Sequence, residues 1–267
     1  MFRFFRTLRQ RLLTENRVSR YLLYALGEIV LVVIGILLAL QINTWNQERE
    51  NRAEERKYLI RLEQDLKRDL ELLESVRANY ERRLVLAVRI LDSIPGSNAA
   101  YVRESPWFQG AWDHYLQHEV VEKQSRGEDL RSILVIAHFA PTETTMEELL
   151  SSGKINLLSN DSLKIKLQYH YPSLNELARF QDVIVMEVQK NYRNTLLGLN
   201  ISLYDHTNLE RIFDSPSLRE QLELALENYL VLTNSMLGSL VYEPDSVFKR
   251  TTLLLQGVQE HLNLLQL

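Results

Sequence analysis

The chain of 267 residues contains 35 acidic residues, 31 basic residues and no cysteine. Without cysteine it forms neither disulfides nor thiolate metal sites. Residues 95–267 hold twenty-two acidic against fourteen basic residues, so they lack the basic surface that nucleic acid binding requires. Only nine Gly and six Pro interrupt stretches rich in Leu, Glu, Arg and Gln, a composition that favours an all-α fold.

Residues 1–18 are predicted to form a basic amphipathic segment at a membrane interface. Apolar side chains recur about one helical turn apart, with arginines between them. A helix of this kind lies in the lipid headgroup layer and is attracted to anionic lipid. A frayed basic tail is the alternative. The apolar residues are Phe2, Phe5, Leu8 and Leu12, and the arginines are Arg3, Arg6, Arg9 and Arg11.

A transmembrane helix is predicted within residues 19–46. Its span, Tyr21 to Ile42, contains fourteen Leu, Ile or Val residues and one charged residue, Glu28. At about 1.5 Å per residue the span extends roughly 33 Å, which is enough to cross a bilayer. It is longer than the apolar region of about 7–15 residues in a cleaved signal peptide, and no small-residue cleavage site follows it. Aromatic residues suited to the two interfaces flank it, namely Tyr21, Tyr24 and Trp45.

Three residues inside this span are candidates for contact with another membrane helix. Glu28 is a candidate functional or pairing residue, because an ionised carboxylate is costly in hydrocarbon. It would pair with an arginine, share a proton with Glu28 of a second subunit, or relay protons. Alternatively, it reaches the near interface beside Arg20. Gly35 and Ala39 are four positions apart, a spacing of small residues that lets helix backbones approach closely.

Residues 47–94 are predicted to form one long amphipathic helix or stalk. No Gly or Pro occurs between Gly35 and Pro95, and Pro95 with Gly96 marks the end after Asp92. The apolar spacing does not keep a strict heptad, so an inter-chain coiled coil and a helix packed on its own domain both fit. The apolar stripe consists of Leu59, Leu62, Leu66, Leu70, Leu73, Val76, Tyr80, Leu84, Val88 and Leu91.

Residues 95–267 are predicted to form a soluble helical domain that packs with the stalk. Ser105-Pro106 and Asn160 are predicted helix starts. Thr145-Met146-Glu147-Glu148 matches a capping box, and Gly153 is a predicted left-handed terminator. Tyr171-Pro172 is expected to bend or end its helix. Apolar periodicity predicts further helices over 173–198, 216–240 and 244–265.

The sequence predicts no catalytic, cofactor or metal site. His114, His118 and Glu122 share a helix face, but their order is not the H-E-x-x-H of zinc peptidases, and a solvated polar face is the preferred interpretation. The stretch from Ser151 to Lys154 is a helix-ending turn rather than a phosphate loop, because the glycine that such a loop needs is missing. No serine-nucleophile elbow occurs. The aromatic residues interpreted as core are Trp107, Phe108, Trp112 and Tyr115.

Two stretches together resemble a known family. Residues 12–52 contain Leu-Tyr-Ala-x-Gly-Glu and then Gln-Ile-Asn-x-Trp-Asn, and residues 146–171 contain a helix, a Ser-Gly-Lys turn and a second helix ending in aromatics. This combination resembles the membrane family called domain of unknown function 6090. The resemblance implies a bacterial, single-pass, mostly helical protein, and it implies no activity or substrate. Its residues are Leu23, Tyr24, Ala25, Gly27, Glu28, Gln41, Ile42, Asn43, Trp45 and Asn46.

We therefore expect a membrane-anchored structural or protein-interaction component, not an enzyme. Its expected partners are the lipid bilayer, further copies of the chain in a homo-oligomer, and an unidentified membrane protein. The alternative is an extracytoplasmic ligand-sensing helical bundle that signals through a partner. Arginines cluster before the span, so the positive-inside rule places the N-terminus in the cytoplasm of a bacterial inner membrane and residues 45–267 outside it. These arginines are Arg9, Arg11, Arg17 and Arg20.

Overall fold

The computed structural model describes residues 17–97, 100–104, 108–118, 126–201 and 209–265. Every regular element in these ranges is a helix, which confirms the predicted all-α fold class. The chain divides into two compact units, Met1–Glu55 and Arg56–Leu267. Residues 1–16 of the predicted interfacial segment and the predicted helix start at Ser105-Pro106 lie outside the described residues.

The first long element, α2 (Arg17–Asp92), is a single helix of 76 residues. It ends at the predicted position. The amides of Ser93 and Ile94 turn back to the carbonyls of Ile90 and Leu91, and Gly96 adopts a positive φ of 87°. A left-handed backbone of this kind favours glycine, because a Cβ would be strained there. The sequence signals Pro95 and Gly96 therefore mark a true helix boundary.

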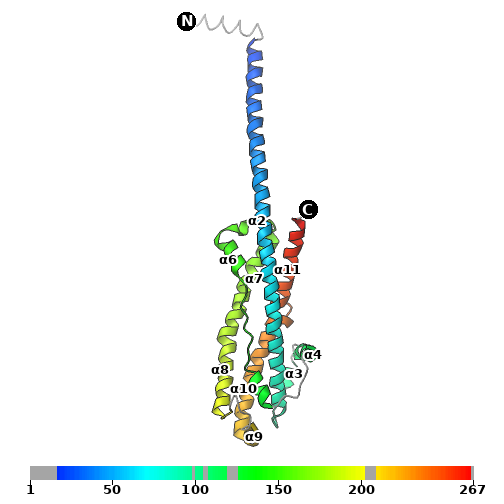
Figure 1. The fold of residues 1–267 in the computed structure, drawn as a ribbon, viewed down its shortest axis with the longest axis vertical. Helices are drawn as coiled ribbons and strands as arrows, with labels where there is room; N and C mark the ends of the chain where they lie inside the picture. Colours follow the sequence, from blue (N-terminus) through cyan, green and yellow to red (C-terminus); the bar gives the residue numbers. More distant parts are fainter. Residues whose placement is uncertain (1–16, 98–99, 105–107, 119–125, 202–208, 266–267) are drawn as a thin grey trace. The chain divides into compact units, whose positions relative to one another are not determined.

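In the described part of the second unit, three long helical rods pack together (Figure 1). The first is α2 from Arg56 onward. The second joins α7 (Asp161–Phe180), the π-helical turn η2 (Gln181–Val185) and α8 (Met186–Gly198). The third joins α10 (Pro216–Leu237) and the π-helical turn η3 (Gly238–Tyr242), and a turn then leads into α11 (Val247–Leu264). Short helices complete the unit, namely α3 (Ala100–Arg103), α4 (Phe108–His118), α5 (Arg126–Ser132), α6 (Thr144–Ser151), η1 (Lys154–Leu157) and α9 (Leu209–Asp214).

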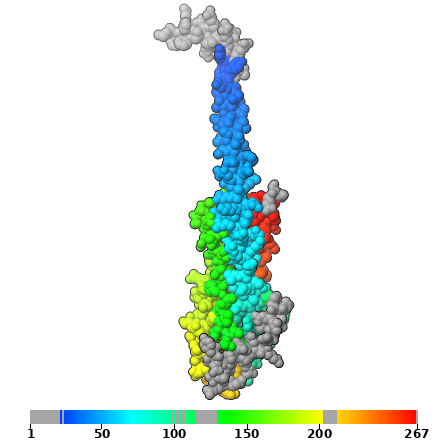
Figure 2. Space-filling view, viewed as in Figure 1, coloured from blue at the N-terminus to red at the C-terminus, as the bar shows by residue number. Residues whose placement is uncertain are grey.

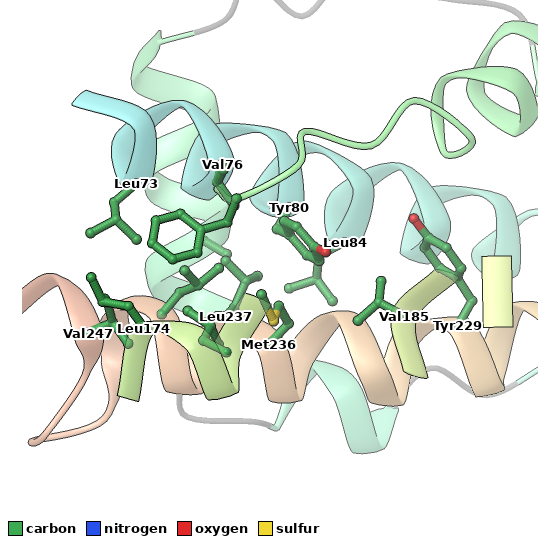
Figure 3. Packing of buried hydrophobic residues seen from close by; sticks show 14 of the residues in the cluster. Leu73, Val76, Tyr80, Leu84, Leu174, Val185, Tyr229, Met236, Leu237 and Val247 are labelled. Carbon is green, nitrogen blue, oxygen red and sulfur yellow. The ribbon is translucent and has the colours of Figure 1, made fainter. Parts of the chain in front are cut away.

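The apolar stripe of α2 forms the centre of this unit. Leu59, Leu62 and Leu66 are fully buried, and Leu73 is 1% exposed. Figure 3 shows Leu73, Val76, Tyr80 and Leu84 facing the apolar side chains of the other two rods. The stripe is therefore covered by helices of its own chain, and it offers no surface to an inter-chain coiled coil. Of the two arrangements that the sequence allowed, the helix packed on its own domain is the one observed.

The predicted capping box at Thr145 is wrong. Helix α6 begins at Thr144, two residues earlier than the box requires; its N-cap is Glu143, and no side chain caps it. Thr145 is buried inside the helix. The Glu148 carboxylate does not turn back to the helix start, because it accepts a hydrogen bond of 2.7 Å from the Tyr58 hydroxyl and pairs with Arg61 at 2.6 Å. Tertiary contacts with α2 therefore override the local motif.

Three further local predictions concern the segment from Gly153 to Pro172. Gly153 has a φ of 71°, and the Asn160 side chain accepts a hydrogen bond from the Leu163 amide, so both predictions are confirmed. Pro172 does not end its helix. It lies inside α7, where Tyr171 and Leu174 are buried and hold the chain against the core. The predicted helix over 173–198 is thus the continuation of α7 through η2 into α8.

Candidate functional site

The segment Tyr21–Ile42 exposes its apolar side chains. The described Leu, Ile and Val residues within it are between 46% and 73% exposed. Its mean hydropathy reaches 2.5 over an 18-residue window that is entirely unburied. Among the described residues, α2 is the one helix with the length and apolarity needed to cross a membrane. Figure 2 shows the surface of this segment in blue. Apolar surface on this scale marks a site of interaction with lipid or protein.

The predicted contact residues of the span share one side of the helix. At about 100° per residue, Glu28, Gly35 and Ala39 lie within roughly 40° of one another. All three are exposed, and a Cβ added at Gly35 would meet no atom within 4 Å. The face is therefore open in the single chain, and its proposed contact with another helix stays a prediction. Tyr21, Tyr24 and Trp45 are exposed at the ends of the segment, as interfacial anchors would be.

His114 is the one member of the candidate set whose side chain is described, and it is not on the solvated face that the sequence predicted, because its side chain is only 16% exposed. Its ring contacts the Glu81 carboxylate through Nδ1 and lies 3.5 Å from Glu74 through Nε2. The side chain of His118 and the whole of Glu122 lie outside the described structure. Within the described residues, no group of three His, Cys, Asp or Glu side chains is arranged to hold a metal ion. The histidine is thus tied to α2 by acidic partners that the sequence pattern did not identify.

Glu81 is the centre of a buried polar cluster that joins three elements. It is 1% exposed, and it accepts hydrogen bonds from Arg77 Nε at 2.9 Å and from the Tyr242 hydroxyl. Burial, together with the bond to Glu81, raises the pKa of Tyr242, so the phenol remains a donor. Gly110 permits the close approach of α4, because a Cβ there would lie 2.7 Å from the Tyr242 ring. The cluster therefore fixes α4 and η3 against α2.

Arg83 is a fully buried cation held by aromatic rings. Its guanidinium carbon lies 4.8 Å from the ring centroids of both Tyr80 and Tyr229. Nε donates to the Ile133 carbonyl at 3.1 Å and to the Tyr229 hydroxyl. Burial raises the pKa of Tyr229 to about 12, although Arg83 opposes this rise. Cation–π attraction is strongest in such desolvated settings and offsets part of the cost of burying the charge.

Residues 133–142, named the strap here, run without regular structure between α2 and the α7–α8 rod (Figure 1). Two side-chain amides each form a pair of hydrogen bonds with backbone groups of the strap. Asn79 donates to the Val135 carbonyl and accepts from the Ala137 amide, both at 3.0 Å. Gln181 donates to the Ala137 carbonyl and accepts from the Phe139 amide, both at 2.8 Å. Gln181 is also the first residue of the π-helical turn η2. The rod therefore departs from α-helical geometry at the residue that holds the strap.

Replacing Gln181 by Ala should release the strap. Two backbone groups would lose their partners, and each buried unsatisfied group costs about 1–3 kcal/mol. We expect a lower unfolding midpoint and faster hydrogen–deuterium exchange in residues 133–142. Gln109→Ala is the control, because Gln109 is exposed and bonds only within its own helix to Asp113. Unchanged exchange in the strap of the Gln181 variant would show that the amide does not hold it.

Asp69 anchors the far end of the strap. Its Oδ1 accepts from the Thr142 amide at 2.8 Å, while Oδ2 is buried without a hydrogen-bond partner in the described structure. Burial raises the pKa of Asp69 to about 6, and the nearby charges of Asp65 and Glu143 add to the rise. The pKa of Tyr171 is raised by its own burial and by the charges of Asp69, Asp65 and Glu143. The carboxyl group therefore binds a proton more tightly in the folded chain than in the unfolded chain.

The fold and these sites define an all-helical protein in which one exposed apolar helix segment precedes the core helix of a bundle. Residues 28–94 of the 267 match the family described as "Family of unknown function (DUF6090)", the family that the sequence resembles. Of the two stretches that carry the resemblance, the first overlaps this range, and the second, 146–171, lies outside it. No curated protein and no solved structure matches the chain.

Proposed function

We propose that the protein is a single-pass membrane component that anchors a helical interaction domain on the outer side of a bacterial inner membrane. The observation that carries this proposal is the exposed apolar segment Tyr21–Ile42. Its Leu, Ile and Val residues each favour insertion by about 0.3 to 0.6 kcal/mol, which together outweighs a cost of about 2.5 to 3.5 kcal/mol for Glu28.

The proposed orientation follows from the charges beside the span. Arg17 and Arg20 lie directly before it, and further arginines precede them, so the N-terminus is the cytoplasmic end. Residues 45–267 then fold outside. The chain has no cysteine, so its fold depends on no disulfide and can form in an oxidising compartment of this kind.

An interaction role fits the use of the buried polar groups. The Glu81 cluster, Arg83 and the amides of Asn79 and Gln181 each bind another helix or the strap. The hydrogen bonds of these polar groups therefore hold the bundle together. A rigid bundle on a membrane anchor is suited to positioning a surface for another protein.

Introducing two charges into the span should detach the protein from the membrane. Val33→Arg combined with Leu37→Arg adds about 2.5–3.5 kcal/mol per residue near the bilayer centre. We expect the wild-type chain to stay in the pellet after alkaline carbonate extraction of cell membranes, and the double variant to leave it. Ile165→Arg with Leu253→Arg is the control, because both residues are exposed in the second unit. Release of the wild-type chain by carbonate would contradict the anchor.

Protease accessibility tests the orientation separately. Protease added to intact spheroplasts should digest residues 45–267 of the wild-type chain. Full protection there, together with retention in the carbonate pellet, would keep the anchor and reverse the topology.

A further inference from the structure

Helices α8 and α10 lie side by side and leave an open groove of about 570 Å³ between them. This groove is the α8–α10 groove. None of its ten lining residues carries a charge, although 25% of the chain is charged. Its floor is apolar, with Val188, Ala225 and Leu232, and primary amides of Asn191 and Asn228 are also part of its lining. Depletion of charge with retained apolar area is typical of the core of a protein–protein interface.

The exposed face of α10 repeats with the spacing of a helix–helix seam. Gln221, Leu224, Asn228, Val231 and Ser235 follow one another at intervals of three and four residues, and every one of them is exposed. Leu224 is 60% and Val231 50% exposed. The opposite face of the same helix is buried in the core through Leu222, Leu226 and Tyr229. Helix α10 therefore has one buried apolar face and one exposed uncharged face, and the exposed face has the heptad spacing by which helices pack together.

We propose that the α8–α10 groove binds the same groove of a second copy of this chain, related by a two-fold axis near Asn228. A two-fold interface places the same surface on both partners, so its residues must complement themselves. Primary amides satisfy this condition, because each one both donates and accepts, and an Asn on such a seam fixes its register. An uncharged groove also avoids the like-charge repulsion that a charged surface would meet in its own copy.

The available area suits a weak dimer whose two copies share a membrane. Helix α10 has 22 residues and is about 33 Å long, and α8 has 13 residues and is about 20 Å long, so at a width of about 10 Å the two helices present roughly 530 Å² per protomer. A standard specific interface buries about 800 Å² per partner, and smaller ones are transient. Attachment to a shared membrane raises the effective concentration of the two copies, which favours a contact of this size. In that respect the inference rests on the proposed membrane anchor.

Cysteine crosslinking of the full-length chain in native membranes tests this interface, because the chain has no cysteine of its own. Under mild oxidation, Asn228→Cys should form a disulfide-linked dimer of twice the chain mass. Leu253→Cys is the matched control, since Leu253 is 64% exposed on α11 and lies outside the groove. Adding Leu224→Glu and Val231→Glu to the Asn228→Cys variant should reduce the dimer at least tenfold.

Three results would overturn the proposal. They are the absence of a dimer from single cysteines at Asn228, Leu224 and Val231, a dimer of equal yield from Leu253→Cys, and a crosslinked product whose mass identifies a different protein. Carbonate extraction of the same samples reports on the anchor. If carbonate releases a crosslinked dimer from the membrane, the proposed anchor is wrong and the proposed interface is retained.

Discussion

Replacing Asp69 by Asn should stabilise the folded chain at pH 8 by up to about 3 kcal/mol and change its stability little at pH 3.5. Burial raises the pKa of Asp69 to about 6 from an ordinary value of 3.8. The stability that this group contributes is therefore fully present below pH 3.8 and is lost as the pH rises through about 6. Asn removes the buried charge and keeps the oxygen that accepts from Thr142.

The measurement is the unfolding midpoint of the detergent-solubilised chain, followed by circular dichroism from pH 3.5 to pH 8. Asp65→Asn is the matched control, because Asp65 is similarly buried on the same helix but pairs with Arg68 at 3.3 Å. That variant should show no gain at pH 8. A loss of stability at pH 8 in the Asp69 variant would mean that its ionised form is favourable in the fold.

His170 makes stability depend on pH in the opposite direction from Asp69, and the two pH ranges overlap. Burial and the charge of Arg250 lower the pKa of His170 from 6.5 to about 4. Its contribution to stability is present above pH 6.5 and is lost as the pH falls through about 4. Between about pH 4 and pH 6 the two groups oppose each other, so the wild-type profile should be nearly flat there. His170→Gln should leave the Asp69 slope visible, with stability falling as the pH rises.

The local features of the fold were predictable because their causes lie within a few residues. Asn160 caps α7 through an amide three residues away, and Gly153 needs only its own left-handed backbone. The capping box at Thr145 failed for the converse reason. The partners of Glu148 are Tyr58 and Arg61, which are about ninety residues distant in the sequence, and no short motif encodes them.

The same distinction applies to the candidate sites. The exposed apolar segment follows from composition alone, whereas the Glu81 cluster joins residues from α2, α4 and η3. Arg77 and Glu81 form a helical pair at a spacing of four, which sequence patterns reveal, but Tyr242 lies 161 residues further along. The leucine stripe was predictable only in part. Its periodicity required a packed partner, and only the folded chain shows that this partner is its own bundle.

Replacing Glu81 by Ala should destabilise the chain by about 3–5 kcal/mol, because removing one member of a buried ion pair leaves the other charge uncompensated. Arg77 would lose its 2.9 Å acceptor, and the Tyr242 hydroxyl and the His114 ring would each lose a partner. A loss of this size is a large part of the roughly 5–15 kcal/mol by which domains are stable. Urea unfolding followed by circular dichroism measures it.

Glu74→Ala is the matched control for this experiment. Glu74 lies two helical turns before Glu81 and contacts Arg77 and His114 as well, but its side chain is 46% exposed. Ion pairs that remain in water contribute about 0–1 kcal/mol, so the control should unfold almost as the wild type does. The double variant Arg77→Met with Glu81→Met should cost less than the two single changes together, because it leaves no buried charge unpaired. Equal losses from Glu74→Ala and Glu81→Ala would mean that burial of Glu81 does not govern the energy of the cluster, and that its contacts act as surface pairs.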